Sequence, residues 1–252
     1  MISLLLTLSP RLSDLTALAQ APWSCGGDAG SAPRGLVADI GCDHGFVAAE
    51  LCARGRDVVA VDIAREPLEC ARAHFASLGL APLAFVESDG LADVDAETAI
   101  VAGLGGRTAA RVIRDATRRD RGPRRYVLQP TQQFLAHARD LRLALHEGGY
   151  APVKEVWRDD NPPNSPLRRP ALRRGRRFLV TIMAERRCDG ASPPTAIELL
   201  VGTRRIAVDA TPAARLKYIV HHRDWLASIA AKTAAETSHL DAVRSWPCRA
   251  GH

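Results

Sequence analysis

The sequence has no Cys-x-x-Cys pair and no group of cysteines and histidines with the spacing of a zinc finger. Its six cysteines are scattered over 252 residues. Scattered cysteines are typical of free thiols in a reducing compartment. We therefore expect a cytoplasmic protein without disulfide bonds and without a bound metal.

A long apolar run is also missing. The segment Met1–Leu8 is apolar, but it has no basic region before it, and Pro10-Arg11 end it well short of a membrane span. We expect a packed first helix over residues 11–20 and no membrane partner. Arg11 and the serines that follow it still leave an organelle address open.

Lysine is scarce, with Lys154, Lys217 and Lys232 as the only three, so that arginine supplies the rest of the basic charge. The formal net charge of +6 favours a polyanionic partner. An arginine bias together with abundant alanine is, however, also typical of a GC-rich genome. Charge alone therefore does not decide for or against nucleic-acid binding.

Apolar strands and amphipathic helices alternate through most of the chain. The expected strands are residues 35–40, 57–62, 83–87, 99–102, 125–129, 153–157 and 178–184. Further helices are expected over 46–54, from Pro67 to Gly79, over 107–118 and over 134–145. This alternation predicts a seven-stranded, mostly parallel sheet with helices on both faces, whose ligands bind beyond the carboxyl ends of the strands.

The composition changes after Gly190, where Ser-Pro-Pro precedes a long helical run over about 213–244. Ile219, Leu226, Thr233 and Leu240 repeat there every seven residues. We therefore divide the chain into an α/β domain, 1–190, and a C-terminal helical hairpin or docked helical region, 191–252. A dimeric coiled coil is the alternative, and a monomer is the expectation.

The turn after the first strand reads Asp39-Ile-Gly41-Cys-Asp43-His44-Gly45. Glycines let the backbone turn tightly beside a ligand, and the next helix begins with free N–H groups. The spacing is G-x-x-x-G, whereas dinucleotide enzymes have G-x-G-x-x-G. Asp39 and Asp43 would repel a pyrophosphate but suit the ammonium and sulfonium groups of S-adenosylmethionine. We expect Asp39, Gly41, Asp43, His44 and Gly45 to bind that cofactor.

Two further acids end the next two strands. Asp62 lies 21 residues after Gly41 and is followed by Ile63. A carboxylate at this position can accept both ribose hydroxyls; a solvated strand-end aspartate is the alternative. Asp89-Gly90 ends the third strand, and Asp89 could accept the adenine amino group. We add Asp62, Ile63, Asp89 and Gly90 to the expected cofactor site.

The fourth strand runs into a glycine-rich turn, Ala102-Gly103-Leu-Gly105-Gly106. Such a turn would face the transferable methyl group and admit a flat substrate. The alternative is a phosphate-binding loop, but the Lys-Ser/Thr that a P-loop requires does not follow. Ala102, Gly103 and Gly105 therefore join the expected cofactor site.

The fifth strand ends in Gln129-Pro130-Thr131. We expect these residues to form a wall of the substrate pocket. An amide offers both a donor and an acceptor, so Gln129 can read a base edge.

In order and spacing, these motifs resemble those of the bacterial tRNA (adenine(22)-N1)-methyltransferase family over most of the chain. The motifs that carry the resemblance are Leu8-Ser-Pro-Arg-Leu12, Ala38-Asp-Ile-Gly-Cys-Asp-His-Gly-Phe46, Ser88-Asp-Gly-Leu91, Ala102-Gly-Leu-Gly-Gly106, Leu128-Gln-Pro-Thr131 and Glu198-Leu-Leu-Val-Gly202. The family pattern has Ala, Tyr and Asn where this chain has Gly45, Phe46 and Thr131. We expect Phe46 to pack rather than to stack on a substrate.

The resemblance implies a Rossmann-like class I methyltransferase that uses S-adenosylmethionine to methylate N1 of an adenine in tRNA. N1 is occupied in a Watson–Crick pair, so the base must be unpaired or flipped out. Methyl transfer then depends mainly on alignment. Asp43, Gln129 and Pro130 are the expected catalytic residues, and Asp43 could stabilise the cationic product. His44 either helps to stabilise the cationic product or has only a structural role, as a capping or packing residue.

Arginines cluster at 118–125, 168–177, 186–187 and 204–205. With the C-terminal helices, they are the expected contacts for tRNA phosphates; a solvated arginine-rich surface is the alternative for each cluster. Three rival functions remain: a methyltransferase for another RNA or for a small molecule, a non-catalytic RNA-binding relative, and a nicotinamide dehydrogenase. The absent G-x-G-x-x-G disfavours the dehydrogenase.

Overall fold

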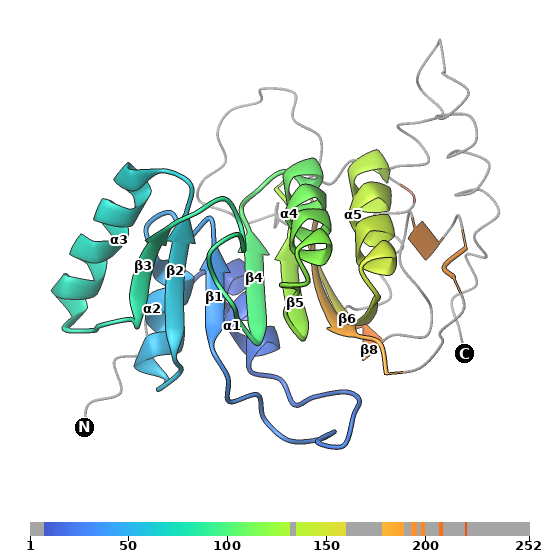
Figure 1. Ribbon diagram of the computed structural model, residues 1–252, viewed down its shortest axis with the longest axis horizontal. Coiled ribbons are helices and arrows are strands. Elements are labelled where there is room, and N and C mark those ends of the chain that lie inside the picture. The colour runs from blue at the N-terminus through green and yellow to red at the C-terminus, as the bar shows by residue number, and fades with distance from the viewer. Residues whose placement is uncertain are drawn as a thin grey trace, which may run out of the picture.

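In the computed structural model, residues 8–131, 135–159 and 178–188 are described, with short pieces at 193–195, 198–199, 207–208 and 220. In this part of the chain, one sheet lies between two layers of helices (Figure 1). The apolar core is therefore divided into two parts, one on each face of the sheet.

The strands lie in the order β3-β2-β1-β4-β5-β7-β6-β8. Their bounds are β1 Val37–Ile40, β2 Val58–Asp62, β3 Ala84–Glu87, β4 Thr98–Ala102, β5 Arg125–Gln129, β6 Tyr150–Asp159, β7 Phe178–Arg186 and β8 Ala207–Val208. Strands β1 to β5 are parallel, while β7 runs antiparallel to both β5 and β6. The expected seven-stranded, mostly parallel sheet is confirmed, and the two-residue β8, parallel to β6, adds an edge strand that we did not predict.

Within the described residues, five helices cover the sheet: α1 Pro10–Ala19, α2 Phe46–Ala53, α3 Arg65–Leu78, α4 Gly106–Arg118 and α5 Leu135–Glu147. Each begins and ends within a few residues of its expected position. In α3, Leu68, Ala71 and Phe75 are buried on one stripe, and Gly79 ends the helix with a φ of +64°. Gly79 can take this left-handed conformation because it has no Cβ.

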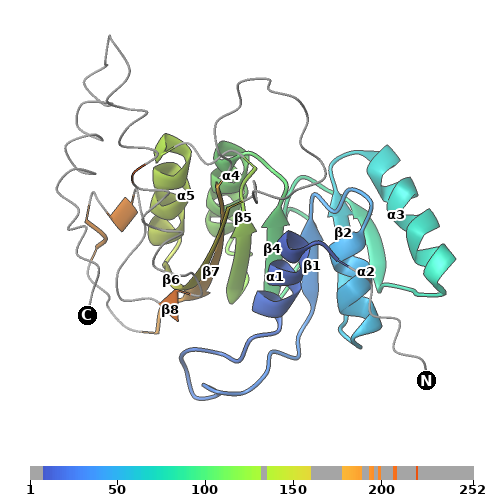
Figure 2. The same ribbon diagram turned by 180° about the vertical axis from the view of Figure 1, so that it is seen from behind.

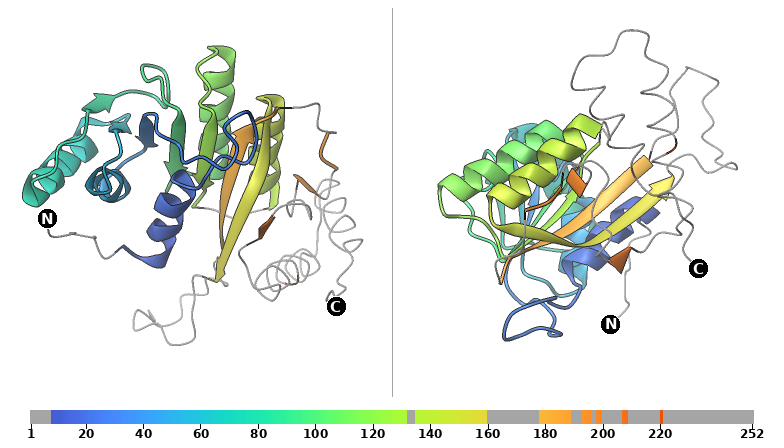
Figure 3. Two further views of the ribbon diagram at one scale, coloured as in Figure 1. Left: turned by 90° about the horizontal axis from the view of Figure 1, so that it is seen from below. Right: turned by 90° about the vertical axis from the view of Figure 1, so that its right-hand side faces the viewer.

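The two faces of the sheet are covered by different helices. Residues of α1, α2 and α3 pack on one face, while those of α4 and α5 pack on the other. The view from behind shows α1 and α2 in front of the sheet (Figure 2), and the side view shows both layers (Figure 3). All four residues of β1 are buried, as expected for a central strand with helices on both faces.

A buried ion pair joins β5 to β7 near the amino end of β5. Arg125 has no exposed surface and pairs with Glu185, and its guanidinium also donates to the carbonyls of Ala21 and Pro22. The expectation that Arg125 binds tRNA phosphates is therefore wrong. A guanidinium removed from water needs partners inside the protein, and these are already supplied.

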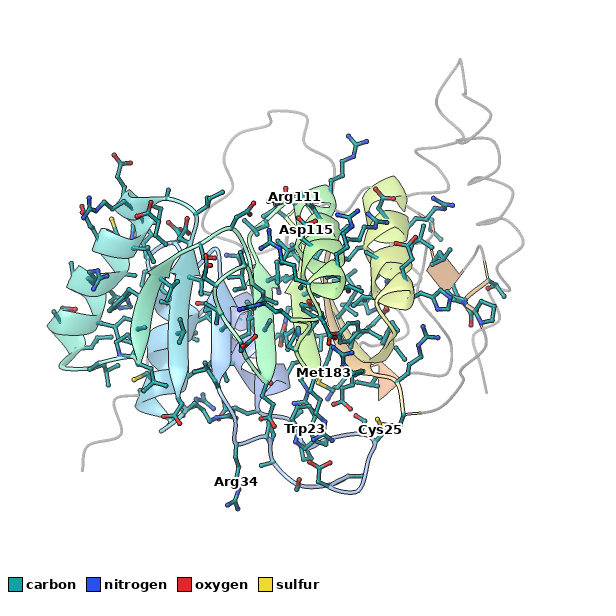
Figure 4. The ribbon with its side chains drawn as sticks, in the orientation of Figure 1. Trp23, Cys25, Arg34, Arg111, Asp115 and Met183 are labelled. Carbon is teal, nitrogen blue, oxygen red and sulfur yellow. The ribbon has the colours of Figure 1, made fainter. Side chains whose placement is uncertain are left out.

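The neighbouring Arg124 is also held by the protein. It pairs with Asp28, and its guanidinium carbon lies 3.9 Å from the ring centroid of Trp23, with that of Arg125 at 4.3 Å. In the view of Figure 4, Trp23 lies toward the lower ends of the strands and Arg111 toward their upper ends. These two arginines fix the segment before β1, and the buried Arg125 is not available as an RNA surface.

Several expectations concern residues outside the described ranges. They are the helical run over 213–244, of which only Val220 is described, the arginine clusters at 168–177 and 204–205, and the domain division at residue 190. These stay predictions. Within the described ranges, no helix has both the length and the apolar character that crossing a membrane requires.

Candidate functional site

Strands β1 and β4 are neighbours at the centre of the sheet, and the chain leaves them in opposite directions. A sheet opens a crevice at such a switch point. The turn after β1 contains Gly41, with a φ of +71°, and the turn after β4 contains Gly103, with a φ of +75°. A Cβ on Gly41 would lie 3.1 Å from the Leu104 side chain, so the two turns are in close contact. The expected cofactor turns are thus adjacent.

Gly45 has a role that the sequence did not reveal. It precedes α2 with a φ of +68°, and a Cβ there would lie 3.0 Å from Cβ of Ala71 and 3.2 Å from the Phe75 ring. Both residues belong to α3. Gly45 therefore permits close packing of α2 on α3, in addition to the tight turn that we expected.

Asp39, near the end of β1, is buried at 4% exposure. Its carboxylate accepts a hydrogen bond from the backbone N–H of Ala48 at 3.1 Å, in the first turn of α2. Burial raises the pKa of Asp39 to about 7; the Ala48 hydrogen bond opposes the shift and the charge of Asp62 adds to it. Through this hydrogen bond, Asp39 fixes the first turn of α2 to the end of β1.

Asp62, at the end of β2, forms hydrogen bonds both to the turn after β1 and to the turn after β2. Its Oδ1 accepts from the N–H of Ala64 at 3.1 Å, and its Oδ2 accepts from the N–H of Asp43 at 3.4 Å. Asp43 has a φ of +51°, rare for a residue with a side chain. Its own carboxylate is 76% exposed, 3.8 Å from His44 Nε2. The exposed carboxylate can therefore reach a ligand in the crevice.

The structure brings Asp39, Asp43 and Asp62 together around Cys42. The pKa of the Cys42 thiol is raised by its burial and then by the charges of these three carboxylates. Among the ion pairs of the described residues, only Asp43–His44 involves any of the three. The turn therefore carries negative charge that a cationic ligand would neutralise.

Two large apolar side chains lie exposed beside these carboxylates. Ile63 is 65% exposed directly after β2, and Phe46 is 45% exposed at the start of α2. The Phe46 ring meets the His74 ring edge-on at a centroid distance of 4.7 Å. Phe46 thus packs against His74, with His44 nearby at a centroid distance of 5.8 Å, while 45% of Phe46 stays exposed. Exposed apolar groups beside a polar crevice are typical of ligand sites.

Asp89, after β3, has a partner that the sequence did not reveal. Its two carboxylate oxygens accept hydrogen bonds from the guanidinium of Arg111 at 2.7 and 2.8 Å. Gly90 has a φ of +66°, and a Cβ there would lie 3.2 Å from Val112. The turn after β3 is therefore docked on α4. No local spacing could have shown this, because 22 residues separate Asp89 from Arg111.

Gln129, at the end of β5, is buried at 2% exposure. Its Nε2 donates to Thr181 Oγ1 at 2.6 Å and to the carbonyl of Arg11 at 3.3 Å. Its Oε1 has no hydrogen-bond partner within the structure as described. The amide is therefore held through its nitrogen, which leaves its oxygen as an unused acceptor.

The turns after β4 and β5 are tied by backbone bonds. Gly103 N–H donates to the carbonyl of Gln129 at 3.2 Å, and Thr131 N–H donates to that of Leu104 at 2.9 Å. Ala102 is half-buried at the end of β4, and Gly105 precedes α4 in an extended conformation. Gln129-Pro130-Thr131 thus lies beside the Gly-Leu-Gly turn. The described residues contain no cluster of three or more His, Cys, Asp or Glu side chains that could hold a metal ion.

The strand order, the antiparallel β7 between β5 and β6, and the glycine-rich turns at the switch point define a Rossmann-like fold of the class I methyltransferase type. The family model of the methyltransferase domain matches residues 31–162. The chain therefore belongs to the methyltransferase domain family.

Solved structures share this fold along nearly the whole chain. A putative tRNA (m1A22) methyltransferase of Streptococcus pneumoniae has a TM-score of 0.67 and 17% identity, with 94% of this chain and 98% of that chain covered. The B. subtilis M1A22 tRNA methyltransferase TrmK has a TM-score of 0.62 and 20% identity, with 95% of each chain covered. TrmK of M. capricolum, solved with S-adenosyl-homocysteine, has a TM-score of 0.67 and 17% identity, with 95% and 97% covered. No curated protein sequence gives a significant match.

Proposed function

We propose that the protein is an S-adenosylmethionine-dependent methyltransferase that modifies N1 of an adenine in tRNA. The cofactor proposal rests on the gathering of Asp39, Asp43 and Asp62 at the switch point of a methyltransferase fold. Among the ion pairs of the described residues, the only partner of these three acids is the imidazole of His44. S-adenosylmethionine brings an ammonium and a sulfonium, which such a site attracts. A pyrophosphate would be repelled.

The residues present fit this cofactor. Asp62, at the end of β2, would accept the ribose hydroxyls, and the exposed Ile63 would offer an apolar surface for the adenine ring. The α2 N-terminus, held by Asp39, suits the carboxylate of the methionine part. When bound, the cofactor supplies an electrophilic methyl group on its sulfonium. The glycine turn with Gly103 and Gly105 has no side chain to obstruct an approaching flat base.

The substrate proposal rests on the side of the site formed by β5. Adenine N1 has an in-plane lone pair, so the protein must mainly align the base and exclude water. Gln129 Oε1 is a buried acceptor without a partner, which the amino group of a bound base would satisfy, and Pro130 follows it as part of the pocket wall. Asp43, whose side chain is 76% exposed, would stabilise the cationic methylated base. We propose these three residues as the catalytic group.

Transfer RNA as the substrate is supported by the likeness to two proteins that are named as tRNA methyltransferases, one of them as putative, and are covered almost completely. The phosphate contacts must come from arginines other than the buried Arg125. Arg118 is a described candidate, since its side chain is 72% exposed. We propose further phosphate contacts from the arginine cluster at 168–177 and from the C-terminal helices. We also propose that the two domains divide at residue 190 and that the protein is a cytoplasmic monomer.

The test is to incubate tRNA from cells that lack the gene with labelled S-adenosylmethionine and to analyse the nucleosides by mass spectrometry. We expect 1-methyladenosine. Label in another nucleoside, or in a different RNA pool, would overturn the substrate. Binding of S-adenosyl-homocysteine without label in any RNA would indicate a non-catalytic relative. Stabilisation by NAD but not by S-adenosyl-homocysteine in a thermal-shift assay would overturn the cofactor.

A further inference from the structure

Arg111 and Asp89 form a two-point ion pair at the edge of the sheet where the parallel strands end. Arg111 Nη1 donates to Asp89 Oδ2 at 2.8 Å, and Nη2 donates to Oδ1 at 2.7 Å. Both side chains are 47% exposed. A planar guanidinium that faces a carboxylate in this way fixes the orientation of the carboxylate as well as its position.

Arg111 is itself held on α4. Its Nη1 also donates to Asp115 at 3.2 Å, one turn further along the helix, and Val112 packs against Gly90. Figure 4 shows Arg111 and Asp115 together at the upper edge of the molecule. The guanidinium is therefore a fixed support for the turn after β3.

Asp89 lies beside the expected position of the adenine ring. Strands β2 and β3 end side by side, because Ser88 N–H donates to the carbonyl of Asp62 at 2.9 Å. The exposed Ile63 and the carboxylate of Asp89 thus follow neighbouring strand ends. Each carboxylate oxygen has one further lone pair after the bond to Arg111. A donor on the ring edge can use one of them.

We propose that Arg111 is a positioning residue that presents Asp89 to the exocyclic amino group of the cofactor's adenine and so selects adenine over hypoxanthine. The inference rests on the proposed function. An ionised carboxylate only accepts hydrogen bonds, and Arg111 lowers the pKa of Asp89, which keeps it ionised. The carbonyl that hypoxanthine carries in place of the amino group would face this carboxylate as a second acceptor, so it would be rejected.

The test compares the affinities of S-adenosyl-homocysteine and S-inosyl-homocysteine by calorimetry for the full-length protein. We expect the wild type to prefer the adenine compound by at least about tenfold. Arg111→Gln should weaken the binding of S-adenosyl-homocysteine by about tenfold and leave the affinity for S-inosyl-homocysteine little changed, so that selectivity is lost. Arg111→Lys, which keeps the charge but not the fork, should restore only part of the selectivity. Arg114→Gln is the matched control on α4, because Arg114 pairs with Glu147 instead, and it should change neither affinity.

Asp89→Asn separates positioning from general damage. In that background, Arg111→Gln should have no further effect on selectivity, because the group that it presents is gone. If Arg111→Gln loses affinity for both compounds equally, or keeps the wild-type preference for the adenine compound, the proposed role of Arg111 is overturned. A wild type that binds neither compound would instead overturn the proposed cofactor. Melting curves of each variant identify losses that come from unfolding.

Discussion

The buried carboxylate of Asp39 accepts the backbone N–H of Ala48 at 3.1 Å, so the end of β1 holds the first turn of α2. This contact places an acid where its charged form is poorly solvated, and its pKa is raised to about 7. The same residue therefore affects both the stability of the fold and the charge of the site.

Stability should fall as the pH rises from about 4 to about 7. The folded protein keeps the proton of Asp39 up to a pKa of about 7, whereas the unfolded chain releases it near its ordinary value of 3.8. Over that window the folded state binds more protons, so this group favours folding at low pH and disfavours it above pH 7. Asp39→Asn removes the charge and should raise the free energy of unfolding at pH 8 by about 1–3 kcal/mol.

Urea denaturation at pH 5 and pH 8 measures this effect. The Asp39→Asn gain should be smaller at pH 5 than at pH 8, because most of the loss of wild-type stability falls between pH 5 and pH 7. The exposed Asp57→Asn is the control and should show no such difference. A gain that is equal at both pH values would mean that the charge of Asp39 is not the cause.

Cofactor affinity should change with pH in the opposite direction. Ionised Asp39 adds negative charge beside the expected ammonium, so affinity for S-adenosyl-homocysteine should increase from pH 6 to pH 8. Asp39→Asn should bind more weakly at pH 8 and lose most of this dependence. Calorimetry across the pH range checks both effects, and a wild-type affinity that is flat from pH 6 to pH 8 would contradict them.

Asp62 should be the most sensitive residue of the site. Asp62→Ala removes the expected ribose acceptor and also frees the N–H groups of Asp43 and Ala64. We expect cofactor affinity to fall by at least about 100-fold, as for the loss of two charged hydrogen bonds. Asp95→Ala is the control, since Asp95 is 80% exposed and pairs with Arg121 at 3.8 Å. Unchanged binding in Asp62→Ala would show that the cofactor lies elsewhere.

Gln129 should affect methyl transfer more than cofactor binding. Gln129→Leu keeps the approximate shape but removes the unused Oε1, so kcat with tRNA should fall by about 10- to 100-fold. Affinity for S-adenosyl-homocysteine should change less than about threefold. Thr181→Val, which removes only the partner of Nε2, should give a smaller decrease in kcat. Parallel losses of kcat and cofactor affinity would point to a structural role instead.

Arg125 and Arg118 should separate stability from RNA binding. Arg125→Gln leaves Glu185 buried without its partner and should destabilise the fold by about 3–5 kcal/mol. Arg118→Gln should leave stability nearly unchanged and weaken tRNA binding, with a shallower dependence on salt. Denaturation and filter binding at several salt concentrations measure the two effects. A large loss of stability in Arg118→Gln would contradict this assignment.

The elements of the fold could be predicted because each carries its own local signal. The stripe Leu68, Ala71 and Phe75 and the stop at Gly79 identify α3 from neighbouring residues alone. The two-residue β8 carries no such signal, because it becomes a strand only by pairing with Lys154 and Glu155 of β6.

The positions of the site residues were predictable, whereas their partners were not. Asp62 and Asp89 were predicted at the ends of successive strands, since parallel strands place their carboxyl ends at one edge. The bond from Arg111 to Asp89 and the burial of Arg125 depend on the packing of distant segments. An arginine at a surface and an arginine in a buried ion pair look the same in a sequence.

Leu104 touches the site from two sides, since its side chain lies against Gly41 and its carbonyl accepts the N–H of Thr131. A rearrangement of the β1 turn when the crevice is filled would thus be transmitted to the strand end beneath the incoming base. Coupling of this kind is reciprocal: whatever factor the cofactor adds to the affinity for RNA, RNA must add to the affinity for the cofactor. Leu104 would thereby couple the binding of cofactor and RNA, whichever of them binds first.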